Sequence, residues 1–540
     1  MQRMRSRQLT ARYDIAIVGS GFSGSLMAMI ACRLGYSVAL IDKGKHPRVV
    51  IGESSTPLTN LLLEEISVRY DLPVLKSLTK WGTWQRDYPG IACGLKRGFT
   101  FYHHDLASPI SNLPDRSQQL LVAASPNDRL ADTHWYRADF DHFLVNQGRQ
   151  MGVNCLDETQ LSSMVELDSG IVLEGKRGGR EMSLFARFLI DASGPRGFVH
   201  RVLDLAERNF PTSPNTQSIY NHFSGVNRIA SHSPDSGEQP PYPVDDAAVH
   251  HIFDGGWIWV LHFNNGLTSA GMAATDRLAS SLNFSHSENA WGEVLRKIPM
   301  LNTQFETAKP EASFSHIPRL SFYSSKIAGS NWAMLPSAAG FIDPLLSTGF
   351  PLTLLGVGRL AEIIEGALEK RHLAPRLLAY GHKTEEELLA TALLIGSLYH
   401  NMHDFPVFSA LTLLYFAAAS FSETVRRLDK PHLAESFLLH DHPLFGATSR
   451  SLMERSLAPR TTDQSARLVE QIHLAIEPFN LAGLGDSGRN NWYPVLAEDL
   501  IRSHAKVNAS PAELSTLLQR CGFPDDNHSL SPASISRSQP

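Results

Sequence analysis

The chain has 540 residues, of which 43% are hydrophobic and 19% are charged, and its formal net charge is −5. This length predicts a large buried core divided into two or three modules, and the composition is that of an ordinary globular enzyme. The chain lacks the broad positive field that nucleic-acid binding requires, so we discount that class. The four cysteines are scattered without a CxxC pair, which favours a reducing, cytoplasmic setting over a zinc site or a disulfide framework.

The N-terminal part of the chain contains a complete βαβ pattern. Residues 1–11 are basic and lack an apolar core, so we expect a disordered tail and not a secretory signal. Within residues 13–42, the apolar runs YDIAIVGS and YSVALID flank the helical pattern GFSGSLMAMIACRLG. We expect the two strands to be parallel and buried, within an α/β nucleotide-binding module that extends over residues 12–375.

Inserted segments and a helical region complete the predicted organisation. Residues 56–129 and 211–324 are rich in aromatic side chains and turn residues, which predicts inserted antiparallel sheet and loops around a substrate cavity. Residues 376–525 have a helical pattern, and residues 526–540 form a polar Ser/Pro tail that we expect to be disordered. Because the uncharged stretch 405–422 contains Pro406 and several hydroxyl residues, we favour a buried or substrate-facing helix over a membrane span.

Three glycines follow the first predicted strand and open the first helix. Gly19 permits a tight turn, Gly21 lets the backbone approach a pyrophosphate, and Gly24 allows close packing of the helix. The N-terminus of the helix would face the phosphates. Asp42 ends the second strand, where a carboxylate would accept hydrogen bonds from an adenosine ribose. Together these residues predict a dinucleotide site.

Four further segments occur in the order seen in flavin-dependent halogenases and related flavoprotein monooxygenases: IGESSTP (51–57), RADFD (137–141), IDASG (190–194) and AAGFIDPLLSTGFPL (338–352). From residue 13 to about residue 360 the chain therefore resembles the flavin-dependent halogenases. The resemblance implies a Rossmann-like FAD-binding module of the flavoprotein monooxygenase type, supplied with FADH2 by a separate flavin reductase. The implied cofactor-binding residues are Gly19, Gly21, Phe22, Ser23, Gly24, Asp42, Glu53, Ser54, Arg137, Asp191, Ser337, Gly340, Asp343, Thr348 and Gly349.

The sequence STG at 347–349 is expected at the start of a helix, where backbone N–H groups stabilise an anion. In the resemblance, Thr348 and Gly349 lie beside the halide and the flavin ring. Tryptophan halogenases carry a glutamate before this serine, where this chain has Leu346; the difference favours an activated phenol or pyrrole over an indole as substrate. Ser337 stands where an acidic or amide residue is usual, and its weaker hydrogen bond would suit an exchangeable flavin.

The aromatic segment GGWIWVLHF resembles the halogenase signature WxWxIP, whose tryptophans lie between flavin and substrate. Trp257 and Trp259 match its first half, whereas Leu261 and His262 replace the Ile and Pro. An aromatic pair in an edge-strand core is the alternative. Lys96 matches the lysine of halogenases that act on phenols and pyrroles, which hydrogen-bonds hypohalous acid or carries the halogen on its amine. Burial would lower the pKa of this lysine; a surface lysine is the alternative.

His103 and His104 have no carboxylate or further histidine at ligand spacing, so no metal site is expected. We interpret the sequence as a two-component flavin-dependent halogenase that uses FADH2, dioxygen and halide. Its catalytic residues would be Lys96, Trp257 and Trp259, and its substrate an aromatic small molecule that is free or tethered to a carrier protein. The alternatives are an FAD-dependent monooxygenase of the same fold without halogenating activity, and a flavin-binding protein that acts mainly through a partner or carrier.

Overall fold

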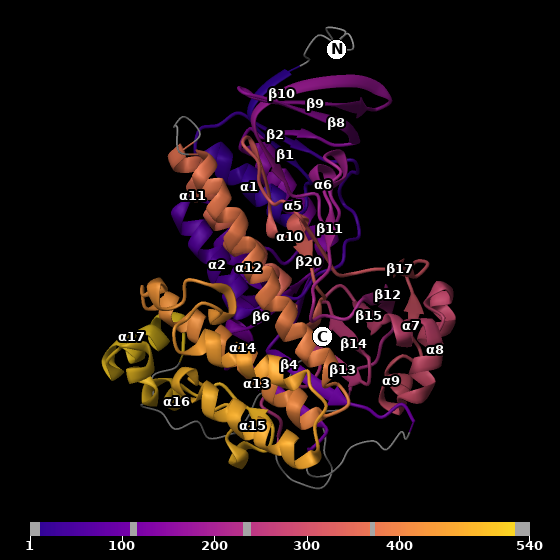
Figure 1. Cartoon of the computed structure of the whole chain (residues 1–540), viewed down its shortest axis with the longest axis vertical. Coiled ribbons are helices and arrows are strands. Elements are labelled where there is room, and N and C mark those ends of the chain that lie inside the picture. The colour runs from indigo at the N-terminus through magenta and orange to yellow at the C-terminus, as the bar shows by residue number, and fades with distance from the viewer. Residues whose placement is uncertain (1–10, 108–115, 230–238, 368–372, 524–540) are drawn as a thin grey trace.

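The computed structural model describes residues 11–107, 116–229, 239–367 and 373–523. The predicted tail at 526–540 lies outside these residues, as does that at 1–11 except for Ala11, which begins the first strand, so this tail was predicted one residue too long. A mixed sheet occupies one end of the molecule, and a second, largely antiparallel sheet with two parallel strand pairs lies toward the other end with its own helices (Figure 1). Helices α11 and α12 extend between the two. The predicted α/β class, with inserted antiparallel sheet and a helical C-terminal region, is confirmed.

The first sheet has the strand order β7-β2-β1-β10-β9-β8, and β19 also pairs with β10. As predicted, β1 lies parallel to β2, and it is also parallel to β10. Strands β8 and β9 extend the sheet in antiparallel fashion. The strands are β1 (Ala11–Val18), β2 (Val38–Ile41), β7 (Asn154–Leu156), β8 (Thr159–Leu167), β9 (Gly170–Arg177), β10 (Arg180–Asp191) and β19 (Trp332–Met334).

Helices α1 (Phe22–Arg33), α5 (Arg137–Gln150) and α11 (Gly349–Ala367) pack together beside this sheet. The end of β1 and nearly all of α1 are buried, because both are apolar on every side. Burying such continuous apolar surface contributes about 25 cal/mol per Å². This packing holds the β1–α1 turn rigidly at the carboxyl edge of the sheet, where α/β proteins bind their ligands.

The second sheet has the order β16-β12-β15-β14-β13-β4-β5-β21, with β17 beside β12. Its strands are β4 (Gly98–His103), β5 (Gln119–Ala123), β12 (Thr216–Ser224), β13 (Ala248–Phe253), β14 (Gly256–His262), β15 (Leu267–Thr275), β16 (Lys309–Pro310), β17 (Ser315–Ile317) and β21 (Trp492–Tyr493). Two small sheets contain β3 (Cys93–Lys96) with β6 (Asp132–Trp135), and β11 (Glu207–Arg208) with β18 (Phe322–Ser324) and β20 (Gly340–Phe341).

The first predicted insertion differs from the expected sheet and loops, because its first half is helical. It forms α2 (Pro57–Arg69), α3 (Pro73–Lys76) and α4 (Trp81–Asp87). Thr56 caps α2 with its side chain, and Pro57 occupies the first turn, where its missing N–H has no cost. The shorter helices elsewhere are α6 (Phe198–Val202), α7 (Asp276–Ser281), α8 (Ser287–Lys297), α9 (Pro299–Gln304) and α10 (Pro336–Ala339).

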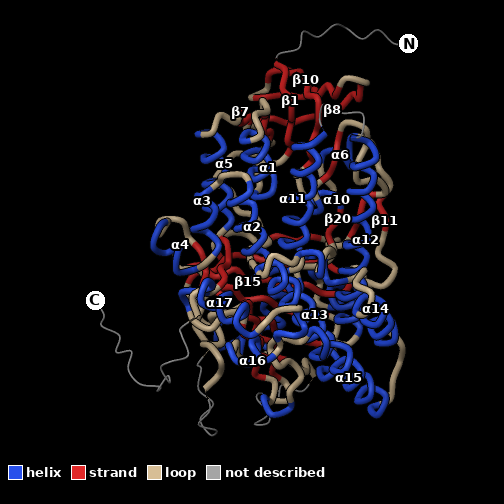
Figure 2. Tube along the Cα trace, turned by 90° about the vertical axis from the view of Figure 1, so that its left-hand side faces the viewer, coloured by secondary structure: helices blue, strands red, loops and turns tan. Residues whose placement is uncertain are grey.

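The C-terminal region is helical, and α14–α16 lie at the end of the molecule opposite the first sheet (Figure 2). Of the described helices, α13 alone is long and apolar enough to cross a membrane. However, 83% of its most apolar 18-residue stretch is buried inside the protein. The uncharged stretch 405–422 is therefore a core helix. The helices are α12 (Leu373–His400), α13 (Phe405–Arg427), α14 (Phe445–Ser456), α15 (Thr462–Ile476), α16 (Ala497–Arg502) and α17 (Pro511–Cys521).

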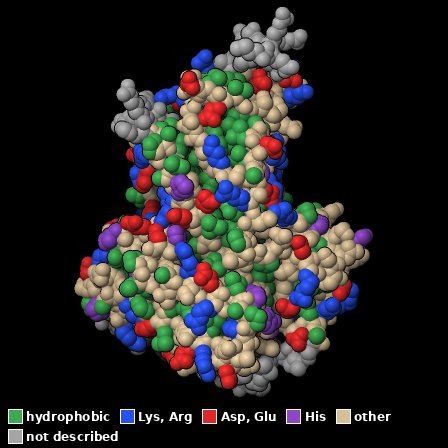
Figure 3. Space-filling view, viewed as in Figure 1, with side chains coloured by type: hydrophobic (Ala, Val, Ile, Leu, Met, Phe, Trp, Pro, Cys, Tyr) green, Lys and Arg blue, Asp and Glu red, His purple; other side chains and the backbone are tan. Residues whose placement is uncertain are grey.

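The face of the molecule seen in Figure 3 carries basic and acidic side chains intermixed over its whole area. This distribution agrees with the slightly negative formal charge of the chain. A mixed surface of this kind does not produce the extended positive potential that attracts a nucleic acid.

Candidate functional site

The turn between β1 and α1 brings backbone close to backbone. Gly19 has φ of +102°, and a Cβ there would lie 2.4 Å from the carbonyl oxygen of Ala192. A Cβ on Gly24 would lie 1.9 Å from the carbonyl oxygen of Gly19, so Gly24 is required for packing of the turn on α1. Gly21 directly precedes α1, whose first N–H groups can bind an anion. The turn has the form of a phosphate-binding loop.

Asp42 is buried at the end of β2 and is already well supplied with donors. The backbone N–H and the hydroxyl of Ser20 each donate to its Oδ2 at 2.8 Å, the N–H of Gly44 donates to Oδ1 at 2.8 Å, and Arg48 donates at 2.7 Å. Burial opposes ionisation, but the hydrogen bonds from Ser20 and the charge of Arg48 hold the pKa of Asp42 below its ordinary value. Asp42 is therefore a fixed negative charge at the predicted ribose end.

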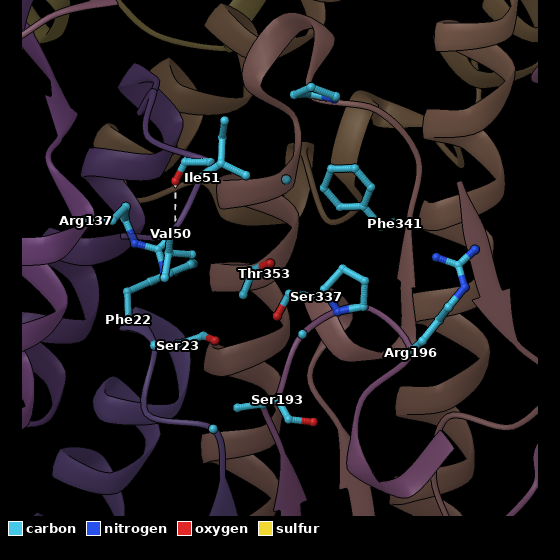
Figure 4. A pocket seen from close by; sticks show the side chains of 18 of the residues that line it. Phe22, Ser23, Val50, Ile51, Arg137, Ser193, Arg196, Ser337, Phe341 and Thr353 are labelled. Carbon is cyan, nitrogen blue, oxygen red and sulfur yellow. Dashed lines mark hydrogen bonds between the residues drawn. The ribbon is translucent and has the colours of Figure 1, made fainter. Parts of the chain in front are cut away.

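Arg137, at the start of α5, makes a bidentate ion pair with Asp141 at 2.7 and 2.8 Å and donates to the carbonyl of Gly52 at 2.9 Å. Both charged groups are almost fully buried. The pair therefore joins α5 to the loop after β2. In Figure 4, Arg137 and Phe22 lie on one side of the cavity, opposite Arg196.

Glu53 lies on the same loop and faces the cavity. His222 Nε2 lies 2.8 Å from Glu53 Oε1, whereas the buried Oε2 has no hydrogen-bond partner among the described residues. A buried carboxylate oxygen without a donor carries a cost of about 1–3 kcal/mol, which a ligand hydroxyl or N–H would relieve. This oxygen and the glycine turn fit the predicted dinucleotide.

The loop that leads into α11 forms another part of the cavity wall. Leu346 and Ser347 both have left-handed backbone conformations, with φ of 63° and 56°, which are uncommon for residues other than glycine. Such strain is typical of ligand sites. Thr348 follows, almost fully buried, and Gly349 begins α11. The predicted halide site thus lies at a helix start that borders the cavity.

The tryptophan pair is buried in β14 and lines the cavity. Trp257 Nε1 donates to the hydroxyl of Tyr399 at 3.0 Å and to Asp343 Oδ1 at 3.2 Å, and Tyr399 donates to Asp343 Oδ2 at 2.9 Å. Burial raises the pKa of Asp343 to about 6, although the N–H of Leu345 opposes the shift. Trp259 donates less strongly, to a serine hydroxyl at 3.3 Å. The network fixes the position of Trp257 relative to the loop at 344–348, which contains the predicted halide site.

Two residues that contact Trp257 were not identified from the sequence. His250, on β13, lines the cavity, and its ring stacks on Trp257 with the centroids 5.2 Å apart. Burial lowers the pKa of His250 to about 3, with a further contribution from Lys96, so the imidazole is neutral. Tyr399 comes from α12. Neither residue stands in a recognisable motif, because only the folding of an inserted sheet and a distant helix brings them to Trp257.

Lys96 is fully buried at the end of β3, so the alternative of a surface lysine is wrong. Its Nζ donates to the hydroxyl of Ser54 at 2.8 Å and to the carbonyl of Ser55 at 2.5 Å. It also lies 3.8 Å from the centroid of the Phe99 ring, within range of a cation–π contact. Desolvation lowers the pKa of Lys96, while the nearby Asp132 opposes the shift.

Most of the predicted site residues border one cavity of about 960 Å³. Figure 4 shows Ser23, Ser193 and Ser337 around it, with Phe341 on the same side as Arg196. The predicted residues that line it are Gly19, Gly21, Phe22, Ser23, Asp42, Glu53, Ser54, Arg137, Trp257, Trp259, Ser337, Gly340, Asp343, Thr348 and Gly349.

Three predicted residues do not line the large cavity. Gly24 lies behind the glycine turn. Asp191 is fully buried and accepts hydrogen bonds from Ser193 and from the backbone N–H of Val199, so it shapes the turn after β10. Lys96 lies behind Ser54, which does line the cavity.

A second cavity, of about 190 Å³, lies beside Phe99, whose ring contacts the Lys96 ammonium. Phe99, the aromatic ring beneath the Lys96 ammonium, forms part of its wall. Tyr415 and Phe416 of α13 add further aromatic surface, and the charged side chains that border it are Lys80, Glu423 and Arg427. Lys96 therefore contacts one wall residue of each cavity, Ser54 of the large one and Phe99 of the smaller aromatic one.

His103 and His104 are bonded within the protein. His103 Nε2 lies 3.0 Å from the carbonyl of Met402, and His104 Nε2 lies 2.9 Å from Nδ1 of His251. In the described part of the chain, no group of three or more His, Cys, Asp or Glu side chains is arranged to hold a metal ion.

Comparison with known proteins connects this geometry to one family. A family model described as tryptophan halogenase matches residues 129–403. The tetracycline 7-halogenase of Kitasatospora aureofaciens is 28% identical over 419 residues, which cover 75% of this chain and 73% of the relative. The monodechloroaminopyrrolnitrin halogenase PrnC of Pseudomonas fluorescens is 29% identical over 383 residues, which cover 70% of this chain and 66% of the relative.

A solved structure shares the fold. The crystal structure of halogenase PltM in complex with phloroglucinol and FAD superimposes with a TM-score of 0.74 and 23% identity. The match covers 86% of this chain and 96% of that chain. The match therefore extends beyond residues 13–360, which carry the sequence resemblance.

Proposed function

This chain belongs to the tryptophan halogenase family, and from that premise we propose that it halogenates an electron-rich aromatic ring, a phenol or a pyrrole, with Lys96 delivering the halogen. It is a flavin-dependent halogenase and thus an FAD-dependent oxidoreductase. The observation that carries the proposal is the position of Lys96, which is fully buried and contacts Ser54 of the large cavity and Phe99 of the second one.

The large cavity is the proposed site of FAD. The glycine turn and Asp42 would hold its adenosine half, and Ser337 and Gly340 would lie along the rest of the cofactor. Thr348 and Gly349 would hold the halide at the start of α11, where N–H groups attract an anion. Reduced FAD, when bound, supplies hypohalous acid from dioxygen and halide. Because the serine at 337 is a weak partner, we propose that the flavin exchanges freely and arrives reduced from a separate reductase.

The second cavity is the proposed site of the aromatic ring. Its walls include Phe99 and Phe416, whose faces suit a flat ring. Hypohalous acid from the large cavity would meet the Lys96 ammonium or amine before it could meet the substrate. Trp257, held by Tyr399 and Asp343, keeps the large cavity closed to direct approach of the ring. A phenolic substrate agrees with the phloroglucinol named for halogenase PltM.

The direct test is mass spectrometry after incubation with FAD, a flavin reductase, NADH, bromide and a panel of phenols, pyrroles and indoles, both free and carrier-bound. We expect a brominated phenol or pyrrole. Hydroxylated products alone would contradict halogenation and would indicate a monooxygenase.

Replacing Lys96 tests its role. Lys96→Ala should abolish brominated product while the oxidation of reduced FAD continues, because the substitution removes the amine and leaves the glycine turn and the loop at 344–349 in place. Lys297→Ala is the matched control, since Lys297 pairs with Glu293 on the surface of α8. Bromination retained by Lys96→Ala would disprove the assigned role.

A further inference from the structure

A buried carboxylate stands directly opposite Lys96. Strands β3 and β6 are antiparallel, and Lys96 is paired in register with Asp132. Side chains of such directly opposed residues lie on the same face of the sheet, with their Cβ atoms about 4.5–5.5 Å apart. Lys96 is 0% and Asp132 5% exposed. The two charge-bearing groups therefore share one region from which water is excluded.

The hydrogen bonds of this pair are incomplete on both sides. The Lys96 ammonium has three N–H donors, of which Ser54 and Ser55 accept two. Asp132 Oδ1 accepts a hydrogen bond from Asn60 at 2.7 Å, but its buried Oδ2 has no partner among the described residues. Lys96 and Asp132 thus each keep one group available for the other or for a reactant between them.

Other acidic groups are less suited to exchange a proton with Lys96. Asp132 is the carboxylate whose charge acts directly on Lys96. Asp343, across the large cavity, is held by Trp257 and Tyr399. The remaining titratable groups that face Lys96 or Asp132 are His134, His250, Tyr415, Glu423 and Arg427.

The protonation states of the pair are finely balanced. Burial lowers the pKa of Lys96 and raises that of Asp132, while their mutual attraction opposes both shifts. His134 and His250 are neutral, because burial lowers both of their pKa values. Among the described residues Lys96 and Asp132 make no direct hydrogen bond with each other, so a proton would pass between them through a water or a reactant that bridges the two groups.

We propose that Asp132 is the proton-exchange partner of Lys96, which holds a proton while Lys96 carries the halogen and returns it when the halogen leaves. This inference rests on the proposed function of Lys96. Asp132 acts through Lys96 and is a positioning residue rather than one that touches the ring.

The steps balance as follows. The Asp132 carboxylate takes a proton from the Lys96 ammonium. The amine attacks the halogen of hypohalous acid; an N–halogen bond forms as the O–halogen bond breaks, and the leaving hydroxide takes the second proton of the nitrogen to give water. A ring carbon then attacks the halogen, the N–halogen electron pair returns to nitrogen, and Asp132 protonates it. The ring finally loses its proton to the Lys96 amine, which restores the ammonium opposite the Asp132 carboxylate.

Asp132→Asn tests the proposal, because the amide has the shape of the carboxylate and no proton to return. We expect oxidation of reduced FAD to continue and brominated product to fall about 100-fold, the usual scale of general acid–base catalysis. Intact-protein mass spectrometry should show bromine in place of one hydrogen retained on the variant, at Lys96 after digestion. Asp128→Asn is the control, since Asp128 is exposed and pairs with Arg97.

A second variant covers the case in which Asp132→Asn does not fold. Asn60→Ala removes the hydrogen bond that lowers the pKa of Asp132, so the acidic limb of the pH–rate profile should move to higher pH. Unchanged product formation by Asp132→Asn, or lost product without retained bromine, would overturn the proposal, as would an unshifted profile in Asn60→Ala. Wild-type enzyme that makes no brominated product would instead contradict the proposed function.

Discussion

Asp42 and Asp132 are both buried carboxylates, but they lie in regions that treat a charge in opposite ways. At the β1–α1 end of the large cavity, two backbone N–H groups, a hydroxyl and Arg48 surround Asp42 and lower its pKa. Beside Lys96, Asp132 has a single donor, from Asn60, and burial raises its pKa. Burial alone therefore does not decide the charge of a carboxylate; the supply of donors does.

The difference separates binding from proton exchange. The region around Asp42 and Arg137 pairs its polar groups within the protein, which suits a cofactor that must be held in one position. The region around Lys96 leaves its polar groups only partly paired, which costs stability but permits protonation to change. Stability measurements on matched variants test this contrast directly.

Arg137→Ala should have the largest effect on stability. It leaves the Asp141 carboxylate buried and unpaired, and breaking a buried ion pair in this way costs about 3–5 kcal/mol of unfolding free energy. Urea denaturation in the absence of FAD measures the change. Arg149→Ala is the matched control on the same helix, because its ion pair with Asp157 is exposed and contributes about 1 kcal/mol or less. Equal losses of unfolding free energy in the two variants would show that the buried ion pair contributes no more than the exposed one.

Lys96→Met should lower the unfolding free energy by less than Arg137→Ala does, by about 1–3 kcal/mol, because it leaves the acceptors on Ser54 and Ser55 without a donor but leaves no charge unpaired. Burial keeps Asp132 in its neutral form once the ammonium is gone. The same urea titration measures this effect, with Lys297→Met as a surface control. A loss as large as that of Arg137→Ala would show that Lys96 is a structural ion-pair residue.

The smallest expected effect is a pH dependence at His222. Burial opposes protonation of His222, but the hydrogen bond to Glu53 raises its pKa above the ordinary value of 6.5. The charged pair therefore stabilises the protein fully below the unfolded pKa, and this contribution is lost as the pH rises through the higher folded pKa. The stability difference between wild type and His222→Gln should be larger at pH 6 than at pH 8.5. A difference independent of pH would exclude a protonated His222.

The local sequence was sufficient to predict the structure of the nucleotide-binding end of the protein. Gly19, Gly21 and Asp42 are close together along the chain, and their spacing between two apolar runs predicted both the turn and the parallel strands. The helices within residues 57–87 were not predicted, because the aromatic and proline content of this segment was interpreted as sheet and loops. The hydrogen bond by which Thr56 caps the first of these helices is seen only in the structure.

The sequence by itself determined the family, the cofactor and the residues of the glycine turn, since each depends on short contiguous segments. Tertiary structure alone decided the environment of Lys96, because its partners Ser54, Phe99 and Asp132 come from different elements. It likewise decided that Tyr399 holds Trp257. Burial and pKa depend on what surrounds a side chain in space, and spacing along the chain does not encode that.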